Sequence, residues 1–305
     1  MASFKSAKDV LQQFESHGYI CDSNLATPIF LMERLEKPLL VEGPPGVGKT
    51  EIAKTLSVTL GRRLIRLQCY EGLDESKALY EWEYTKQLLY TQILKDRIGD
   101  LVNETETIAN AVETLNQEGK AFFSRYFLLP RPLLEAILST EPVVLLIDEI
   151  DRADDEFESF LLEILSDFQV SIPELGTLTA AQRPLVVLTS NANRSLSEAL
   201  RRRCLYLYID YPPFDQETRI VLCKVPNLNE DLANQVVRFV QKIRKLNVRK
   251  PPSIAETIDW AMALVVLNAE NLSRDILSST LNVLMKDRED IDRIMKENYN
   301  DLSSR

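Results

Sequence analysis

Short, almost continuous apolar runs alternate with segments of helical spacing over the first two thirds of the chain. Such runs are typical of strands that are buried on both faces of a parallel sheet. Five are found: KPLLVEG at 37–43, RRLIRLQCY at 62–70, EPVVLLIDE at 141–149, RPLVVLTSN at 183–191 and CLYLYID at 204–210. Helical segments between them indicate an α/β fold, in which helices flank a parallel sheet.

Helical periodicity is clearest at 157–168, where apolar residues recur three or four positions apart. The segment TEIAKTLSVTLG at 50–61 also predicts a helix, with Gly61 as its C-terminal stop. Two short β-prone runs around Pro-Glu-Leu-Gly predict a hairpin at about 169–180.

The pattern changes at about 210–214, because residues 215–305 contain no strand-like run and are predicted to be helical. Ser253 and Glu256 form a capping-box pattern, which marks the start of one of these helices. We therefore divide the chain into an α/β core at 1–210 and a C-terminal all-α domain at 211–305.

Composition narrows the class of protein. The chain has 305 residues, 45% apolar and 27% charged, and a formal net charge of −10, which argues against broad nucleic-acid binding. No apolar run approaches the ~20 residues that span a bilayer, so we expect no membrane insertion. Four scattered cysteines and one histidine do not suggest a zinc site or a disulfide framework, and they suit a reducing cytoplasm.

A phosphate-binding motif follows the first strand. GPPGVGKT at 43–50 fits G-x-x-x-x-G-K-[ST] between a strand and a helix. In such a loop glycines let the backbone approach phosphate oxygens, the lysine reaches the β- and γ-phosphates, and the threonine hydroxyl binds Mg²⁺. The alternative is an ordinary Gly-Pro turn before a helix. The predicted nucleotide-binding residues are Gly43, Pro44, Pro45, Gly46, Val47, Gly48, Lys49, Thr50 and Glu51.

Two further strands end in polar side chains that suit nucleotide hydrolysis. Asp148 closes the strand VVLLID, where it is placed to hold Mg²⁺ together with Thr50. Glu149 follows it and is the predicted group that polarises the attacking water. Asn191 follows the strand LVVLTS and can bind both this water and the γ-phosphate. The alternatives are carboxylates that only cap a strand and an asparagine that only forms a turn.

These motifs, in this order and followed by a helical region, resemble an AAA+ P-loop ATPase. The stretch LLIDEIDRADDEFESFLLEILSDFQVSI, followed by a hairpin and VVLTSN, is similar to the MoxR family. RRLIRLQCYEGLDESKALYEWEY and ILSDFQVSIPELGT look most like its CoxD-like subgroup, which is associated with the maturation of molybdenum-containing carbon monoxide dehydrogenase. The resemblance covers nearly the whole chain.

The resemblance implies a five-stranded parallel sheet in the core, a C-terminal helical lid domain at 211–305, an assembly and a task. AAA+ proteins form rings, commonly hexamers, which bind ATP and Mg²⁺ between neighbouring copies and remodel a client protein. Here the client would be a molybdenum hydroxylase, and a von Willebrand-type protein is a possible partner. MoxR-like proteins carry an insert, expected at about 73–100, where Tyr80, Trp82 and Tyr84 either contact the client or pack in the core. Two alternatives stay open, a nucleic-acid-remodelling motor and a nucleotide-switched scaffold with little turnover.

The lid departs from the family pattern. MoxR-like proteins carry an S-P-R-A segment whose arginine contacts the γ-phosphate, and the matching stretch PPSIAET has Ile254 at this position. An aliphatic side chain cannot bind phosphate, so we expect Arg249 or Lys250 to replace the arginine.

The triplet RRR at 201–203 lies where AAA+ rings place the arginine that reaches the neighbour's ATP. Alignment with the family's D-R-F selects Arg203 as this finger and leaves Arg202 as the alternative; Arg152 is a further interface candidate. We expect Arg201 and Arg202 to be solvated charges at a helix end, and the finger to have no partner in a single chain. The predicted catalytic residues are Lys49, Glu149, Asn191 and Arg203.

Overall fold

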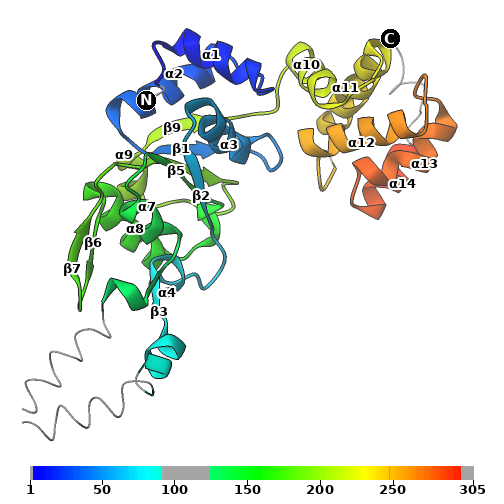
Figure 1. Cartoon of the computed structure of the whole chain (residues 1–305). Coiled ribbons are helices and arrows are strands. Elements are labelled where there is room, and N and C mark those ends of the chain that lie inside the picture. Colours follow the sequence, from blue (N-terminus) through cyan, green and yellow to red (C-terminus); the bar gives the residue numbers. More distant parts are fainter. Residues whose placement is uncertain (1–2, 91, 93–123, 247, 297–305) are drawn as a thin grey trace, which may run out of the picture.

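The computed structural model describes residues 3–90, 92, 124–246 and 248–296. A five-stranded sheet in the order β2-β5-β8-β1-β9 forms the centre of the α/β part (Figure 1). All neighbouring strands are parallel, so the predicted fold class is confirmed. The strands are β1 (Leu39–Glu42), β2 (Arg63–Gln68), β5 (Val143–Asp148), β8 (Leu185–Ser190) and β9 (Leu205–Tyr208).

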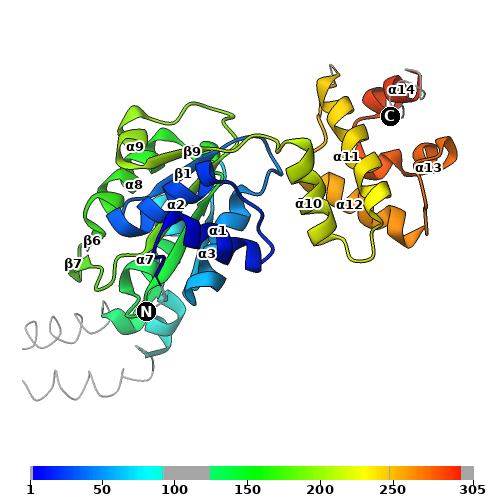
Figure 2. The same cartoon turned by 90° about the horizontal axis from the view of Figure 1, so that it is seen from above.

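Helices cover both faces of this sheet, which explains why its strands read as apolar runs (Figure 2). Strand β5 is buried along its whole length. One face packs against α1 (Ala7–Ser16), α2 (Ser23–Leu35) and α3 (Lys49–Leu60). The other packs against α7 (Pro132–Leu138), α8 (Asp155–Asp167) and α9 (Glu198–Arg203).

The register aligns the carboxyl ends of the strands at one edge. Gln68 of β2 lies beside Asp148 of β5, and Glu42 of β1 lies beside Ser190 of β8. Loops that follow these strands therefore converge at one place, where open α/β sheets bind their ligands.

Two small antiparallel pairs extend from this core. Strands β3 (Tyr80–Trp82) and β4 (Leu128–Pro130) pair with each other beside α4 (Glu75–Ala78) and the 3₁₀ helix η1 (Arg125–Phe127). Strands β6 (Gln169–Ile172) and β7 (Gly176–Thr179) form a hairpin.

The insert expected at 73–100 lies partly outside the described residues. Within its described part, Trp82 is buried in the core, Tyr80 is half-buried and Tyr84 is exposed. Among the three aromatic residues, Tyr84 is thus the most exposed.

Five helices with a core of their own follow the sheet (Figure 1). Their centre is Trp260, which is fully buried and donates a hydrogen bond to Thr280. The predicted capping box of Ser253 and Glu256 is confirmed. These helices are α10 (Phe214–Lys224), α11 (Glu230–Lys245), α12 (Ile254–Val266), α13 (Arg274–Leu284) and α14 (Arg288–Lys296).

The buried side chain of Arg244 links the segment between β9 and α10 to these helices. Arg244 of α11 forms a two-pronged ion pair with the fully buried Glu217 of α10, with N–O distances of 2.7 and 2.8 Å. Its guanidinium also donates to the carbonyl of Pro252 and lies 4.2 Å from the ring centre of Tyr211. The segment between β9 and α10 is thereby held against the lid.

Within the described part of the chain, no helix combines the length and apolar character needed to cross a membrane.

Candidate active site

The loop between β1 and α3 has the backbone conformation that phosphate binding requires. Gly46 and Gly48 have φ angles of 71° and 95°, in the left-handed region that favours glycine. The loop leads into the N-terminus of α3, whose first N–H groups have no partner within the helix. A helix N-terminus of this kind binds anions.

Lys49, the first residue of α3, has a buried ammonium group with three acceptors. Its Nζ donates to the carbonyls of Gly43 and Pro44 and to Oδ1 of Asn191, each at 2.7 Å. Burial lowers the pKa of Lys49 to about 8, and the nearby carboxylates of Asp151, Asp148 and Glu149 oppose this shift. The structure thus joins the β1–α3 loop to the end of β8.

Asp148 is buried at the end of β5 and accepts hydrogen bonds from two hydroxyls. Its Oδ1 lies 3.0 Å from Oγ1 of Thr50 and 2.5 Å from Oγ1 of Thr189. The same Thr189 oxygen accepts the backbone N–H of Glu149 at 2.9 Å. Thr189 therefore links the Asp148 carboxylate to the Glu149 backbone.

Glu149 has a left-handed backbone, with φ 56° and ψ 50°, which is costly for a residue with a side chain. Its carboxylate pairs with Nε of Arg152 at 2.8 Å and accepts from Nε2 of Gln68 at 3.1 Å. Arg66, also on β2, places Nη2 at 2.5 Å from Oδ2 of Asp148. Both carboxylates thus have arginine partners in this structure.

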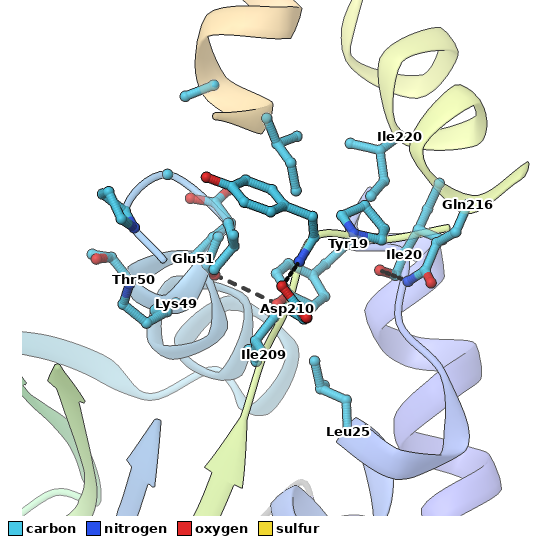
Figure 3. Close-up of a pocket in the computed structure, with 18 of the residues that line it drawn as sticks. Tyr19, Ile20, Leu25, Lys49, Thr50, Glu51, Ile209, Asp210, Gln216 and Ile220 are labelled. Atoms are coloured by element: carbon cyan, nitrogen blue, oxygen red, sulfur yellow. Dashed lines mark hydrogen bonds between the residues drawn. The ribbon is translucent and has the colours of Figure 1, made fainter. Parts of the chain in front are cut away.

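A cavity of about 690 Å³ lies above these groups. Its walls come from the β1–α3 loop, from residues 18–25, from the segment 207–213, and from α10 and α12 of the lid. Figure 3 shows Lys49 and Thr50 on one side, and Gln216 and Ile220 of α10 on the opposite side. The volume suits a ligand of nucleotide size.

Helix α12 of the lid contributes no basic side chain to the described lining of the cavity. Ile254 lines the cavity, as the sequence alignment implies. Arg249 instead pairs with Asp287 and Glu289, and the backbone N–H groups of Arg249 and Lys250 donate to Asp290. Neither belongs to the described lining of the cavity, so this structure gives no support to the expectation that one of them replaces the family's lid arginine, which stays a prediction. Lys224 of α10 is the lysine that the lid contributes to this lining.

The arginine triplet lies on α9 and does not join the cavity lining in the described residues. Arg201 pairs with the buried Glu42 at 2.7 Å while 39% of its side chain stays exposed, so it is a partly solvated ion-pair partner at the helix end. Arg202 is 77% exposed and pairs with Glu198 one turn earlier. Arg203 donates to the carbonyl of Leu162 and to Ser166 of its own chain. The expectation that a single chain leaves Arg203 without a partner is therefore wrong.

Four polar residues of the site were missed by motif reasoning: Arg66, Gln68, Asp151 and Thr189. Arg66 and Gln68 alternate with apolar residues at the end of β2, a pattern that could have indicated two polar side chains on the same face of the sheet. Thr189 stands in an apolar strand, where a buried hydroxyl needs a partner.

The oxygen groups present fit a magnesium nucleotide. Mg²⁺ takes one or two protein oxygen ligands together with phosphate and water oxygens, and Thr50 and Asp148 offer such a pair. Among the described residues no cluster of three or more His, Cys, Asp or Glu forms an all-protein metal site. The donor set therefore suits a metal that arrives with phosphates.

Comparisons with known proteins agree with this geometry. The model of the AAA domain (dynein-related subfamily) matches residues 38–204, more than half of the chain. Midasin of Dictyostelium discoideum is 25% identical over 231 residues, which make up 73% of this chain and 3% of Midasin. An uncharacterized protein of Staphylococcus aureus is 23% identical over 267 residues, 84% of this chain and 87% of that protein.

Among solved structures, a proline-to-glycine mutant of Thermotoga maritima RuvB matches with a TM-score of 0.50 and 18% identity. The match covers 93% of this chain and 74% of that chain. This likeness supports the fold. The family match over residues 38–204 shows that the chain belongs to the AAA domain family, in its dynein-related subfamily, and is an AAA+ protein.

Proposed function

We propose that the protein hydrolyses ATP to ADP and phosphate, with Mg²⁺, in this cavity. The observation that carries the proposal is the meeting of five polar side chains at one edge of the sheet, from two strand ends and one helix start: Lys49, Thr50, Asp148, Glu149 and Asn191. AAA+ proteins generally use ATP and Mg²⁺, which supports the same conclusion.

The β1–α3 loop would bind the triphosphate. Backbone N–H groups around Gly46 and Gly48 and the Lys49 ammonium supply positive charge toward its oxygens. Thr50 and Asp148 would hold Mg²⁺, which neutralises charge on the phosphates. Lys49 already donates to two loop carbonyls and to Asn191, so phosphate would replace existing partners of a buried ammonium.

Glu149 and Asn191 would act on the water. Glu149 accepts a proton as water attacks the γ-phosphorus, the bond to the β,γ-bridging oxygen breaks, and ADP leaves. Asn191 positions the water and the γ-phosphate. Arg152 and Gln68 hold the Glu149 carboxylate and so set its direction.

Hydrolysis is proposed to take place in a ring of identical copies of the chain. Each copy would consist of a core at 1–210 and a lid at 211–305. Arg203, or Arg202 as the alternative, would reach the neighbour's γ-phosphate. The motifs DEIDRA and VVLTSN support a MoxR-like, CoxD-like chaperone that remodels a molybdenum enzyme. The net charge of −10 speaks against a nucleic-acid motor.

Phosphate release and ATP binding by Lys49→Ala test the proposal, with Lys54→Ala as the matched control. Lys54 lies on the same helix, and its side chain is 54% exposed. Because Lys49 would supply charge-assisted hydrogen bonds of about 1.5–3 kcal/mol each, we expect its loss to weaken ATP binding roughly 10- to 100-fold and to stop turnover. Equal behaviour of the two variants would refute the proposed site.

A further inference from the structure

A second buried carboxylate lies behind the proposed catalytic groups. Asp151 belongs to the 3₁₀ helix η2 (Ile150–Arg152) and is 4% exposed. Its Oδ1 accepts the backbone N–H of Asn191 at 3.1 Å. Its Oδ2 accepts the backbone N–H of Asn193 at 3.1 Å and the side-chain amide of Asn193 at 2.7 Å. All three donors belong to the loop that follows β8.

This loop needs an external support. Ala192, between the two asparagines, has a φ of 58°, which costs about 1 kcal/mol or more for a residue with a Cβ. The loop N–H groups have no strand partner, since β8 ends at Ser190. A carboxylate offers two oxygens and only accepts hydrogen bonds, so it can hold three donors at once.

The side chain of Asn191 contacts the β1–α3 loop region through Lys49. Oδ1 of Asn191 accepts from Nζ of Lys49 at 2.7 Å, while the Asn191 backbone donates to Asp151. Asn191 therefore lies between the Asp151 carboxylate, which accepts its backbone N–H, and the Lys49 ammonium, which donates to its side chain. A shift of the loop would move its side-chain amide relative to Lys49.

We propose that Asp151 is a positioning residue, which acts through Asn191 by fixing the loop that carries it. This inference rests on the proposed function, in which Asn191 orients the attacking water. Asp151 itself is not part of the described cavity lining, and its carboxylate accepts hydrogen bonds from the loop backbone. Its removal should consequently alter turnover much more than ATP affinity.

The informative substitution is Asp151→Asn, which keeps the shape and removes one acceptor. The single remaining oxygen can keep both donors of Asn193, and the new NH₂ group then faces the N–H of Asn191. Asp154→Asn is the matched control, because Asp154 is exposed and its side chain does not cap α8. Each protein is examined by residue-resolved amide hydrogen exchange, by ATP binding and by phosphate release.

We expect the Asn191 amide to exchange at least roughly tenfold faster in Asp151→Asn, while the amides of β8 keep their protection. Turnover should fall about 10- to 100-fold with ATP affinity changed less than about threefold. In an Asn191→Ala background the same substitution should cost less than about twofold, because its effect passes through Asn191.

Unchanged exchange at Asn191, or a full additional loss of turnover in the Asn191→Ala background, would overturn the inference. If Asp151→Asn does not fold, the wild-type protein still decides: an Asn191 amide that exchanges as fast as one in an unstructured peptide contradicts it. A wild-type protein without turnover would refute the proposed function instead, and the exchange data would still test the position of Asn191.

Discussion

At the scale of single residues, Thr189 connects the two acidic groups of the site. Its hydroxyl donates to Oδ1 of Asp148 and accepts the N–H of Glu149, and the residue is 1% exposed. Both partners are buried or partly buried, so water cannot easily replace the hydroxyl. Loss of this oxygen would leave a buried donor without an acceptor, which costs about 1–3 kcal/mol.

Thr189→Val is therefore expected to lower the free energy of unfolding by about 1–3 kcal/mol and to slow phosphate release at least roughly tenfold. Thr189→Ser keeps the hydroxyl and loses only a methyl group, at about 1 kcal/mol. The serine variant should keep turnover within about threefold of wild type. Chemical denaturation and phosphate release measure both effects. A valine variant as active as the serine variant would contradict the bridging role.

Motif reasoning could predict part of this residue-level arrangement. The spacing of Lys49 and Thr50, and acidic residues after an apolar strand, carry their chemistry locally. The contacts of Gln68 with Glu149 and of Asp151 with Asn191 depend on which strands and loops are neighbours in space. Strand order is a non-local property, so no local pattern could specify these pairs.

At the scale of elements, the N-terminus of α12 is seated on the β1–α3 loop. A Cβ at Gly46 would lie 2.4 Å from the Cβ of Ser253, which belongs to the capping box of α12. Glycine is therefore required at position 46 for two reasons: the backbone has a left-handed φ, and α12 of the lid lies too close for a side chain.

Gly46→Ala should weaken ATP binding at least tenfold, because the new methyl group collides with α12 and strains the loop. Gly61→Ala is the matched control, since Gly61 has a similar φ of 61° and nothing lies within 4 Å of its added Cβ. We expect this control to lose about 1 kcal/mol of stability and to bind ATP normally. Calorimetric ATP titration and thermal unfolding separate the two effects. Equal ATP affinity of the two variants would refute the seating of the lid.

The elements of the central sheet were predictable, because each strand is an apolar run bounded by turns. Strands β3 and β4 were not predicted. Each has three residues, and Glu81 pairs with Leu129 far along the chain, so neither carries a local signal. The lid helix α12 was indicated by its capping box, whereas the partners of Arg249 depend on the packing of α14.

At the scale of the whole molecule, the arginines of α9 connect the chain to a proposed ring. All three have partners within the chain; Arg202 and Arg203 are exposed, and Arg201 is half-buried. A finger acting across an interface would exchange these contacts for the neighbour's phosphate. The assembly would have several times the mass of the 34.9 kDa chain, which light scattering in the presence of ATP can detect.

Mixing Arg203→Ala with Lys49→Ala subunits tests this arrangement. Each variant alone should be inactive, and the mixture should recover part of the turnover, because some interfaces then combine an intact finger with an intact Lys49. A trans arginine can contribute roughly 10³–10⁵ in rate. Recovery in mixtures of Arg202→Ala with Lys49→Ala subunits, and not in mixtures with Arg203→Ala, would identify Arg202 as the finger. Absence of recovery with both would contradict an arginine that acts across subunits.

The central claim is hydrolysis of ATP with Glu149 as the group that activates water. The most direct measurement is phosphate release at saturating ATP and Mg²⁺ by the wild type and by Glu149→Gln, with ATP affinity determined for both. Glu156→Gln, an exposed position in the first turn of α8, is the control. We predict that Glu149→Gln binds ATP as the wild type does and releases phosphate about 10²–10⁴-fold more slowly, with the control unchanged. Phosphate release by Glu149→Gln at the wild-type rate would contradict the account.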